Sequence, residues 1–107
     1  MGIMKRALLT LVALAFVAGA QGAIQFKTVE YKEGDTVLEG LHVYDDAIQG
    51  KRPGVLVVHQ WKGLTDYERK RAEMLARLGY NVFAADIYGK GIRPKDTKEA
   101  AAQAGKY

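Results

Sequence analysis

Two short polar segments hold the residues whose types could do chemistry. The segment His59–Gly63 (HQWKG) directly follows the apolar run Val55–Val58, and the segment Asp86–Gly91 (DIYGKG) directly follows the apolar run Val82–Ala85. In a loop between a buried strand and a helix, backbone N–H groups can point at an anion or at a developing oxyanion. The two segments therefore indicate a site at the carboxyl ends of strands, where open α/β sheets bind ligands.

The sequence contains neither serine nor cysteine at any of its 107 positions. Covalent acyl chemistry needs an activated nucleophile, most often one of these two side chains. The threonines expected in loops or caps, Thr36, Thr65 and Thr97, have no base positioned beside them by the sequence. We therefore expect the chain by itself to be inactive as a covalent hydrolase.

The charged and histidine side chains near these segments have simple structural interpretations. His42 and His59 are isolated and lack nearby carboxylates at ligand spacing, so neither a metal nor a cofactor is predicted. We expect His59 to be a hydrogen-bonded structural residue and Asp86 to accept backbone N–H bonds from the loop that follows it. Arg69 begins a basic run that is expected to be a solvated helix face.

The first elements that would position these segments are two strands. Residues 24–31 and 36–44 are rich in β-branched and aromatic residues and flank the turn 32–35, which predicts a β-hairpin. Within the first strand, the apolar phase slips near Lys27 and Thr28, which suggests a β-bulge. In the second strand, Val37, Leu41 and Val43 are expected to share one face.

A βαβ unit follows the hairpin. The apolar run Val55–Val58 predicts a strand covered on both faces, parallel to the strand Val82–Ala85. Between them, Thr65 and Glu68 form a T-x-x-E capping box, and Gly79 marks the helix end. The apolar members of this helix at shared-face spacing are expected to be core: Tyr67, Met74, Leu75 and Leu78.

A second capping signature, residues 96–99, predicts a last short helix through Ala104. The predicted fold class is therefore α/β, with a β-hairpin, then a parallel βαβ unit, then a short helix.

From Val55 to Gly91 the residues strongly resemble the dienelactone hydrolase family, and the motifs HQWKG and DIYGKG carry that resemblance. The resemblance extends from about Phe26 to Tyr107 and implies the N-terminal portion of an α/β-hydrolase sheet, residues 24–107, truncated before the nucleophile elbow. It also implies that nucleophile, acid and catalytic histidine all lie downstream of this segment, since the triad follows that chain order.

The same resemblance assigns roles to three residues. Trp61 would offer its backbone N–H as one half of the oxyanion hole, and its ring would line the pocket, with Tyr88 as a second substrate contact. Gln60 occupies the place where many family members carry a glutamate that contacts the nucleophile. An amide cannot accept a proton near neutral pH, so this departure argues against activation by a carboxylate at this position and against dienelactone as the substrate.

Residues 1–20 read as an export signal. Lys5 and Arg6 precede an apolar run of about half the length that a membrane span needs, and Ala18-Gly19-Ala20 matches a cleavage pattern. We expect cleavage after Ala20, a periplasmic or extracellular product, and no stable membrane anchor. The net charge of +4 is too small and scattered to predict nucleic-acid binding.

Three hypotheses follow. The first is the N-terminal part of an exported hydrolase that acts on an ester, a lactone or a related acyl bond. The second is a non-catalytic interaction protein, which could self-associate because the edge at Val55–Val58 would be bare and apolar. The third is a truncated product without activity.

Overall fold

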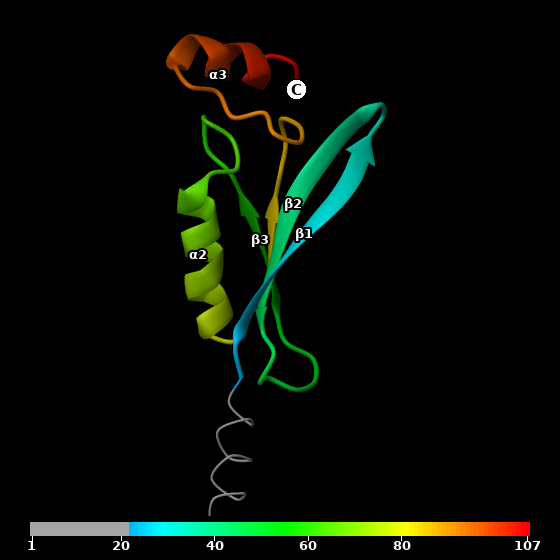
Figure 1. Cartoon of the computed structure of the whole chain (residues 1–107), viewed down its shortest axis with the longest axis vertical. Helices are drawn as coiled ribbons and strands as arrows, with labels where there is room; N and C mark the ends of the chain where they lie inside the picture. The colour runs from blue at the N-terminus through cyan, green and yellow to red at the C-terminus, as the bar shows by residue number, and fades with distance from the viewer. Residues whose placement is uncertain (1–21) are drawn as a thin grey trace, which may run out of the picture.

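A computed structural model describes residues 22–107, and the predicted signal peptide lies outside them. Six elements follow in the predicted order: β1 (Ile24–Glu33), β2 (Thr36–Asp45), β3 (Gly54–Val58), α2 (Asp66–Arg77), β4 (Asn81–Ala85) and α3 (Thr97–Ala104). Figure 1 shows α2 along the sheet and α3 beyond the ends of β3 and β4. The predicted α/β class and the order of its elements are confirmed.

The strands form one sheet in the order β1-β2-β4-β3. The hairpin strands β1 and β2 are antiparallel, β2 continues antiparallel to β4, and β4 pairs parallel with β3. The carboxyl ends of β3 and β4 therefore lie side by side, which brings the two predicted loops to one edge of the sheet. Among the described strands, β1 and β3 are the two edges of the sheet, and the prediction that β3 lies at an edge is confirmed.

The bulge expected in β1 is absent. Ten residue pairs match one to one from Ile24 with Asp45 to Glu33 with Thr36. The phase slip has another cause, because the hairpin changes the face that it buries. Phe26 packs against the core under α2, whereas Tyr31 packs on the opposite face, where its ring centroid lies 5.8 Å from that of Phe83.

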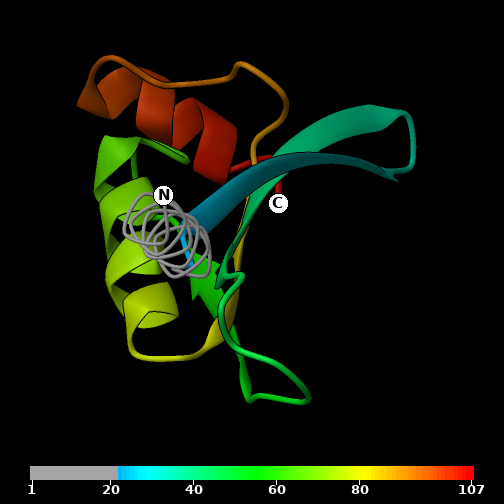
Figure 2. The same ribbon diagram turned by 60° about the horizontal axis from the view of Figure 1, so that its bottom comes forward.

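The core lies between the sheet and α2, and small side chains form the helix side of it. Ala72 and Ala76 have no exposed area and contact Val43, Val82 and Ala84 of the sheet. An i, i+4 alanine pair lets the helix approach the strands closely. Figure 2 shows α2 and α3 on the same side of the sheet.

The predicted helix face was largely wrong. Tyr67, Met74 and Leu78 are 50%, 48% and 76% exposed, and only Leu75 of the predicted group packs against the core. The physical reason is that the alanines already fill the helix-sheet gap at close approach. Tyr67 and Met74 of α2, and Leu78 just after its end, therefore remain exposed.

The strand β3 is not covered on both faces within the described residues. Val57 packs toward the core, but Leu56 is 65% exposed and Val58 is 56% exposed. The single helix that packs on the sheet, α2, covers only one of its faces. An unbroken apolar run indicates that both faces of a strand favour burial. It does not indicate that the described residues cover both faces.

The predicted helix caps are confirmed. The Glu68 carboxylate accepts from the backbone N–H and the hydroxyl of Thr65 at 3.1 and 3.0 Å, and the Asp96 carboxylate accepts from Glu99 N–H at 2.8 Å. Gly79 has φ of +102° just after the end of α2, as expected for a left-handed residue there. In residues 22–107, no helix has the length and apolar character needed to cross a bilayer.

Candidate active-site loops

The loop after β3 begins with a β-turn over residues 60–63. Its closing hydrogen bond runs from Gly63 N–H to the Gln60 carbonyl at 3.1 Å. Gly63 is buried with φ of +86°, and an added Cβ would lie 3.1 Å from the Ile92 carbonyl oxygen. Only glycine can adopt this φ and fit this close approach without strain, so Gly63 determines where the turn ends.

Trp61 is the second residue of this turn. In the described part of the chain its backbone N–H has no acceptor, and its ring is 48% exposed. The Trp61 carbonyl, in contrast, accepts a hydrogen bond from the Tyr88 hydroxyl at 2.9 Å. The residue therefore presents a free N–H on a backbone that is held from the neighbouring loop.

His59 links the same two loops. Its Nε2 accepts from Ile87 N–H at 3.0 Å, and its Nδ1 lies 2.8 Å from the Gln60 carbonyl oxygen. These partners together assign the neutral tautomer that carries its proton on Nδ1, since Nε2 must keep its lone pair. The ring also stands edge-on against Tyr88, with centroids 4.7 Å apart. The prediction of a hydrogen-bonded structural histidine is confirmed.

Asp86 organises the loop after β4. The residue has no exposed area, and its Oδ1 accepts from the N–H groups of Tyr88 and Gly89, both at 3.1 Å. Its Oδ2 accepts from Glu39 N–H of β2 at 2.9 Å. The predicted role of Asp86, an acceptor of backbone N–H bonds, is confirmed and extends to a neighbouring strand.

Tyr31 completes the anchoring of Asp86. Its hydroxyl donates to the Asp86 carbonyl at 2.7 Å, and it accepts from Asp86 N–H at 2.8 Å. Burial raises the pKa of the Tyr31 hydroxyl above its ordinary value. The hydroxyl therefore stays protonated well above neutral pH, and so it can act as both donor and acceptor there.

Gln60 and Tyr88 differ in how free their side chains are. The Gln60 side chain is exposed and has no hydrogen-bond partner among residues 22–107, so its amide can turn toward a nearby group. Tyr88 is only 7% exposed, and its hydroxyl is used by the Trp61 carbonyl. The geometry therefore gives Tyr88 a supporting position behind the loop, in addition to the substrate contact expected for it.

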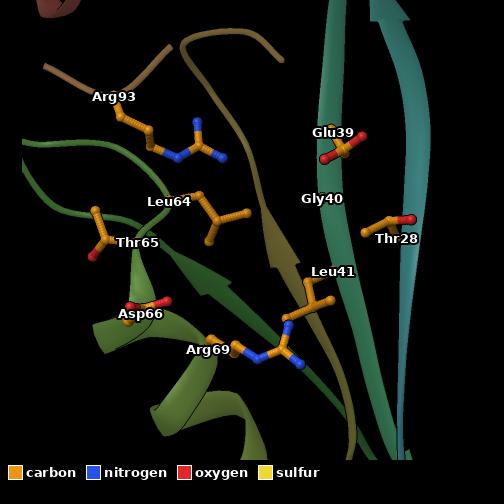
Figure 3. Close-up of a pocket in the computed structure, with 9 residues that line it drawn as sticks. All are labelled: Thr28, Glu39, Gly40, Leu41, Leu64, Thr65, Asp66, Arg69 and Arg93. Atoms are coloured by element: carbon orange, nitrogen blue, oxygen red, sulfur yellow. The ribbon is translucent and has the colours of Figure 1, made fainter. Parts of the chain in front are cut away.

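A cavity of about 370 Å³ lies beside these loops, between the hairpin and the start of α2. Figure 3 shows Arg69 and Arg93 pointing from the helix side toward the hairpin, with Leu64 and Leu41 between. The Arg69 guanidinium lies 4.2 Å from the Phe26 ring centroid, so this exposed residue is not only part of a solvated face. Sequence periodicity gave no signal for this cavity, because hairpin, helix and loop each contribute to its walls.

The cavity is separate from the turn that carries Trp61. Its nine lining residues include neither Gln60, Trp61 nor Tyr88. Its two arginines are balanced by two carboxylates, Glu39 and Asp66. Across residues 22–107, no cluster of three or more His, Cys, Asp or Glu side chains is placed to hold a metal ion.

Comparison with known proteins gives a consistent result. The model of the dienelactone hydrolase family matches residues 38–106. Among solved structures, a protein named m3DLH is similar with 35% identity and a TM-score of 0.74 over 79% of this chain. A dienelactone hydrolase-like promiscuous phosphotriesterase from metagenomic libraries is similar with 34% identity and a TM-score of 0.73 over 80% of this chain.

These similarities cover 35% and 36% of the two solved chains, so this chain spans about a third of their length. No curated protein matches the chain. The neighbours share the mixed α/β arrangement, and the expected resemblance to the N-terminal portion of this fold is confirmed.

Replacing Asp86 with alanine should lower the free energy of unfolding by about 3 kcal/mol or more, because two buried N–H groups and one part-buried N–H group lose their acceptor. Urea denaturation of the chain measures this change. The exposed turn residue Asp35 provides the matched control, and Asp35→Ala should change stability by less than about 0.5 kcal/mol. Equal effects of the two substitutions would contradict the anchoring role of Asp86.

Proposed function

The chain belongs to the dienelactone hydrolase family, and from that premise we propose that it supplies the oxyanion-donor side of an exported hydrolase. The bond cleaved would be an ester, a lactone or a related acyl bond. The nucleophile, the acid and the catalytic histidine would come from residues outside this sequence, so the chain alone would be inactive. The absence of serine and cysteine from its 107 residues supports that inactivity.

The free backbone N–H of Trp61 is the observation that carries this proposal. Attack on an acyl carbon moves negative charge onto its oxygen, and a pre-oriented N–H stabilises that charge in the transition state. The Gln60 carbonyl, which shares a peptide unit with this N–H, accepts from Gly63 N–H at 3.1 Å. Tyr88 also holds the Trp61 carbonyl at 2.9 Å, so the donor needs little reorganisation when charge develops. The half-exposed Trp61 ring is free to contact the substrate beside this donor.

Gln60 would face the nucleophile as a hydrogen-bonding amide. It can donate to or accept from a thiol or hydroxyl, but it cannot take up the proton during activation. Proton removal would therefore depend on the histidine of the complete site. This departure favours ordinary esters over dienelactone as the substrate.

The similar solved protein that is a promiscuous phosphotriesterase extends the substrate range that merits testing. A phosphoryl oxygen also gains negative charge when the phosphorus is attacked, and the same N–H could stabilise it. We place acyl substrates first, because the family name describes lactone hydrolysis.

The donor role can be tested in a chimera in which residues 38–106 replace the corresponding segment of the phosphotriesterase relative. Trp61→Pro removes the N–H and suits the second position of a β-turn, so kcat should fall about 10²–10³-fold. Trp61→Ala keeps the N–H and removes the ring, so it should mainly raise KM. Hydrolysis of p-nitrophenyl acetate measures both.

The 107-residue chain alone is the companion control and should give no turnover above an unrelated protein. If Trp61→Pro left kcat of the chimera unchanged, the donor role would be wrong. Turnover by the chain alone would instead contradict its proposed inactivity.

Export is proposed from the first 20 residues, which lie outside those that the structure describes. Expression in a bacterial host should give a product outside the cytoplasm whose first residue is Gln21, because small residues at 18–20 match a cleavage pattern. Intact-mass spectrometry of the fractions tests this. A Lys5→Glu/Arg6→Glu variant should stay uncleaved, and an uncleaved wild-type chain in the cytoplasm would refute export.

The second candidate is a non-catalytic interaction protein that associates through the β3 edge. The observation that favours it is the free edge of β3, beside exposed Leu56 and Val58. An unpaired strand edge next to apolar side chains is a template for pairing with another strand. A second copy of this chain would present the same edge, which makes a two-fold pair possible.

Light scattering during size-exclusion chromatography should then show a dimer of the chain, and Leu56→Lys should restore the monomer, since a charge blocks edge pairing. Leu78→Lys is the control, because Leu78 is also exposed but lies at the C-terminal end of α2, away from β3, and it should leave association unchanged. A wild-type monomer at every concentration would eliminate this candidate.

A further inference from the structure

We propose that His59 is a positioning residue that sets the direction of the Trp61 backbone N–H. The inference rests on the proposed function of Trp61 as an oxyanion donor. It concerns a residue that touches neither substrate nor nucleophile and that acts through the peptide bond between Gln60 and Trp61. Its Nδ1 lies 2.8 Å from the oxygen of that peptide.

The Gln60 carbonyl and the Trp61 N–H belong to one peptide unit. The described chain has no cis peptide bond, so the Gln60 carbonyl and the Trp61 N–H point in opposite directions within one plane. Any partner that holds the carbonyl therefore also aims the N–H. Rotation of this plane would turn the donor away from the oxyanion position.

Two donors hold the Gln60 carbonyl. Gly63 N–H closes the turn at 3.1 Å, and the His59 Nδ1–H approaches the same oxygen at 2.8 Å. A carbonyl has two lone pairs, so both bonds can form together. The turn bond alone leaves the plane able to tilt about the chain axis, and a second donor from another direction removes that freedom.

His59 can act in this way because the loop after β4 fixes its ring. Ile87 N–H donates to Nε2 at 3.0 Å, so Nε2 stays unprotonated and the single ring proton is on Nδ1. The Tyr88 ring packs edge-on against the imidazole and limits its rotation. The bond from Nδ1 to the Gln60 carbonyl therefore sets the direction of the Trp61 N–H, and contacts with residues 87 and 88 support that bond in the wild type.

Two substitutions separate the two functions of the ring. In His59→Asn, the side-chain NH₂ occupies the position of Nδ1 and can still donate to the Gln60 carbonyl, but the bond to Ile87 is lost. In His59→Gln, the amide oxygen reaches the position of Nε2 and can still accept from Ile87 N–H, but the donor to Gln60 is lost. Each variant loses one hydrogen bond, so their stabilities should be similar.

Residual dipolar couplings of the ¹⁵N-labelled chain measure the direction of the Trp61 N–H without any substrate. The His59→Asn variant should keep the wild-type coupling, and the His59→Gln variant should show a coupling shifted toward zero, because the N–H samples more directions. Long-range ¹⁵N spectra of wild type should show the neutral His59 with its proton on Nδ1. A protonated Nε2, or an unchanged coupling in His59→Gln, would overturn the proposal.

The kcat and KM of the chimera described above measure the consequence for catalysis. His59→Gln should lower kcat at least tenfold with KM little changed, because the donor acts on charge that develops in the transition state. His59→Asn should stay within about threefold of wild type. Equal losses in the two variants would refute positioning through Nδ1.

These two readouts separate the failure of the inference from the failure of the proposed function. If the dipolar couplings change as expected but kcat does not, His59 orients the N–H and Trp61 is not an oxyanion donor. If Trp61→Pro lowers kcat while the His59 variants behave alike, the donor role stands and the positioning role is wrong.

Discussion

The buried carboxylate of Asp86 is the interaction on which the arrangement of both loops depends. A carboxylate without exposed area is costly unless its charge is met by hydrogen-bond donors. Here three backbone N–H groups meet it, two from the following loop and one from β2. Such charge-assisted bonds are stronger than neutral ones. They fix the loop after β4 relative to the hairpin, and they hold the backbone from which the Tyr88 side chain extends.

From that fixed point, two side-chain contacts extend to the loop after β3. Tyr88 holds the Trp61 carbonyl, and Ile87 N–H holds the His59 ring. Because β3 and β4 are parallel neighbours, their following loops are close enough for these contacts. The Asp86 carboxylate fixes the loop after β4, and that loop in turn supports the orientation of the turn at Trp61. Such preorganisation is what an oxyanion donor requires, since its dipole must not turn during the reaction.

Local signals predicted much of this fold. The caps at Thr65 and Asp96 and the left-handed Gly79 depend on hydrogen bonds within a few residues, so sequence spacing was sufficient to find them. The structural roles of His59 and Asp86 were also predicted from their places at strand ends.

What the sequence did not contain was the identity of partners far along the chain. The contact between Ile87 and His59 spans 28 positions, and that between Asp86 and Glu39 spans 47. The outer face of α2 was misassigned for a related reason. Periodicity identifies a stripe of larger apolar residues, but the distance between helix and sheet decides whether that stripe or the alanine stripe is buried.

The exposed apolar side chains lie apart from the hydrogen bonds that hold the two loops. The large exposed apolar side chains include Leu56 and Val58 on β3, Tyr67 and Met74 on α2, and Leu78 at the C-cap of α2. None of these five takes part in the hydrogen bonds between the two loops, which join His59 to Ile87 and Trp61 to Tyr88. None takes part in the bonds from Tyr31 and Glu39 that anchor Asp86 to the hairpin. Whatever packs on the β3 edge would therefore change association and stability first. The contacts that hold the turn at Trp61 all lie inside the described segment, so the proposed oxyanion donor would be oriented without help from the rest of a catalytic site.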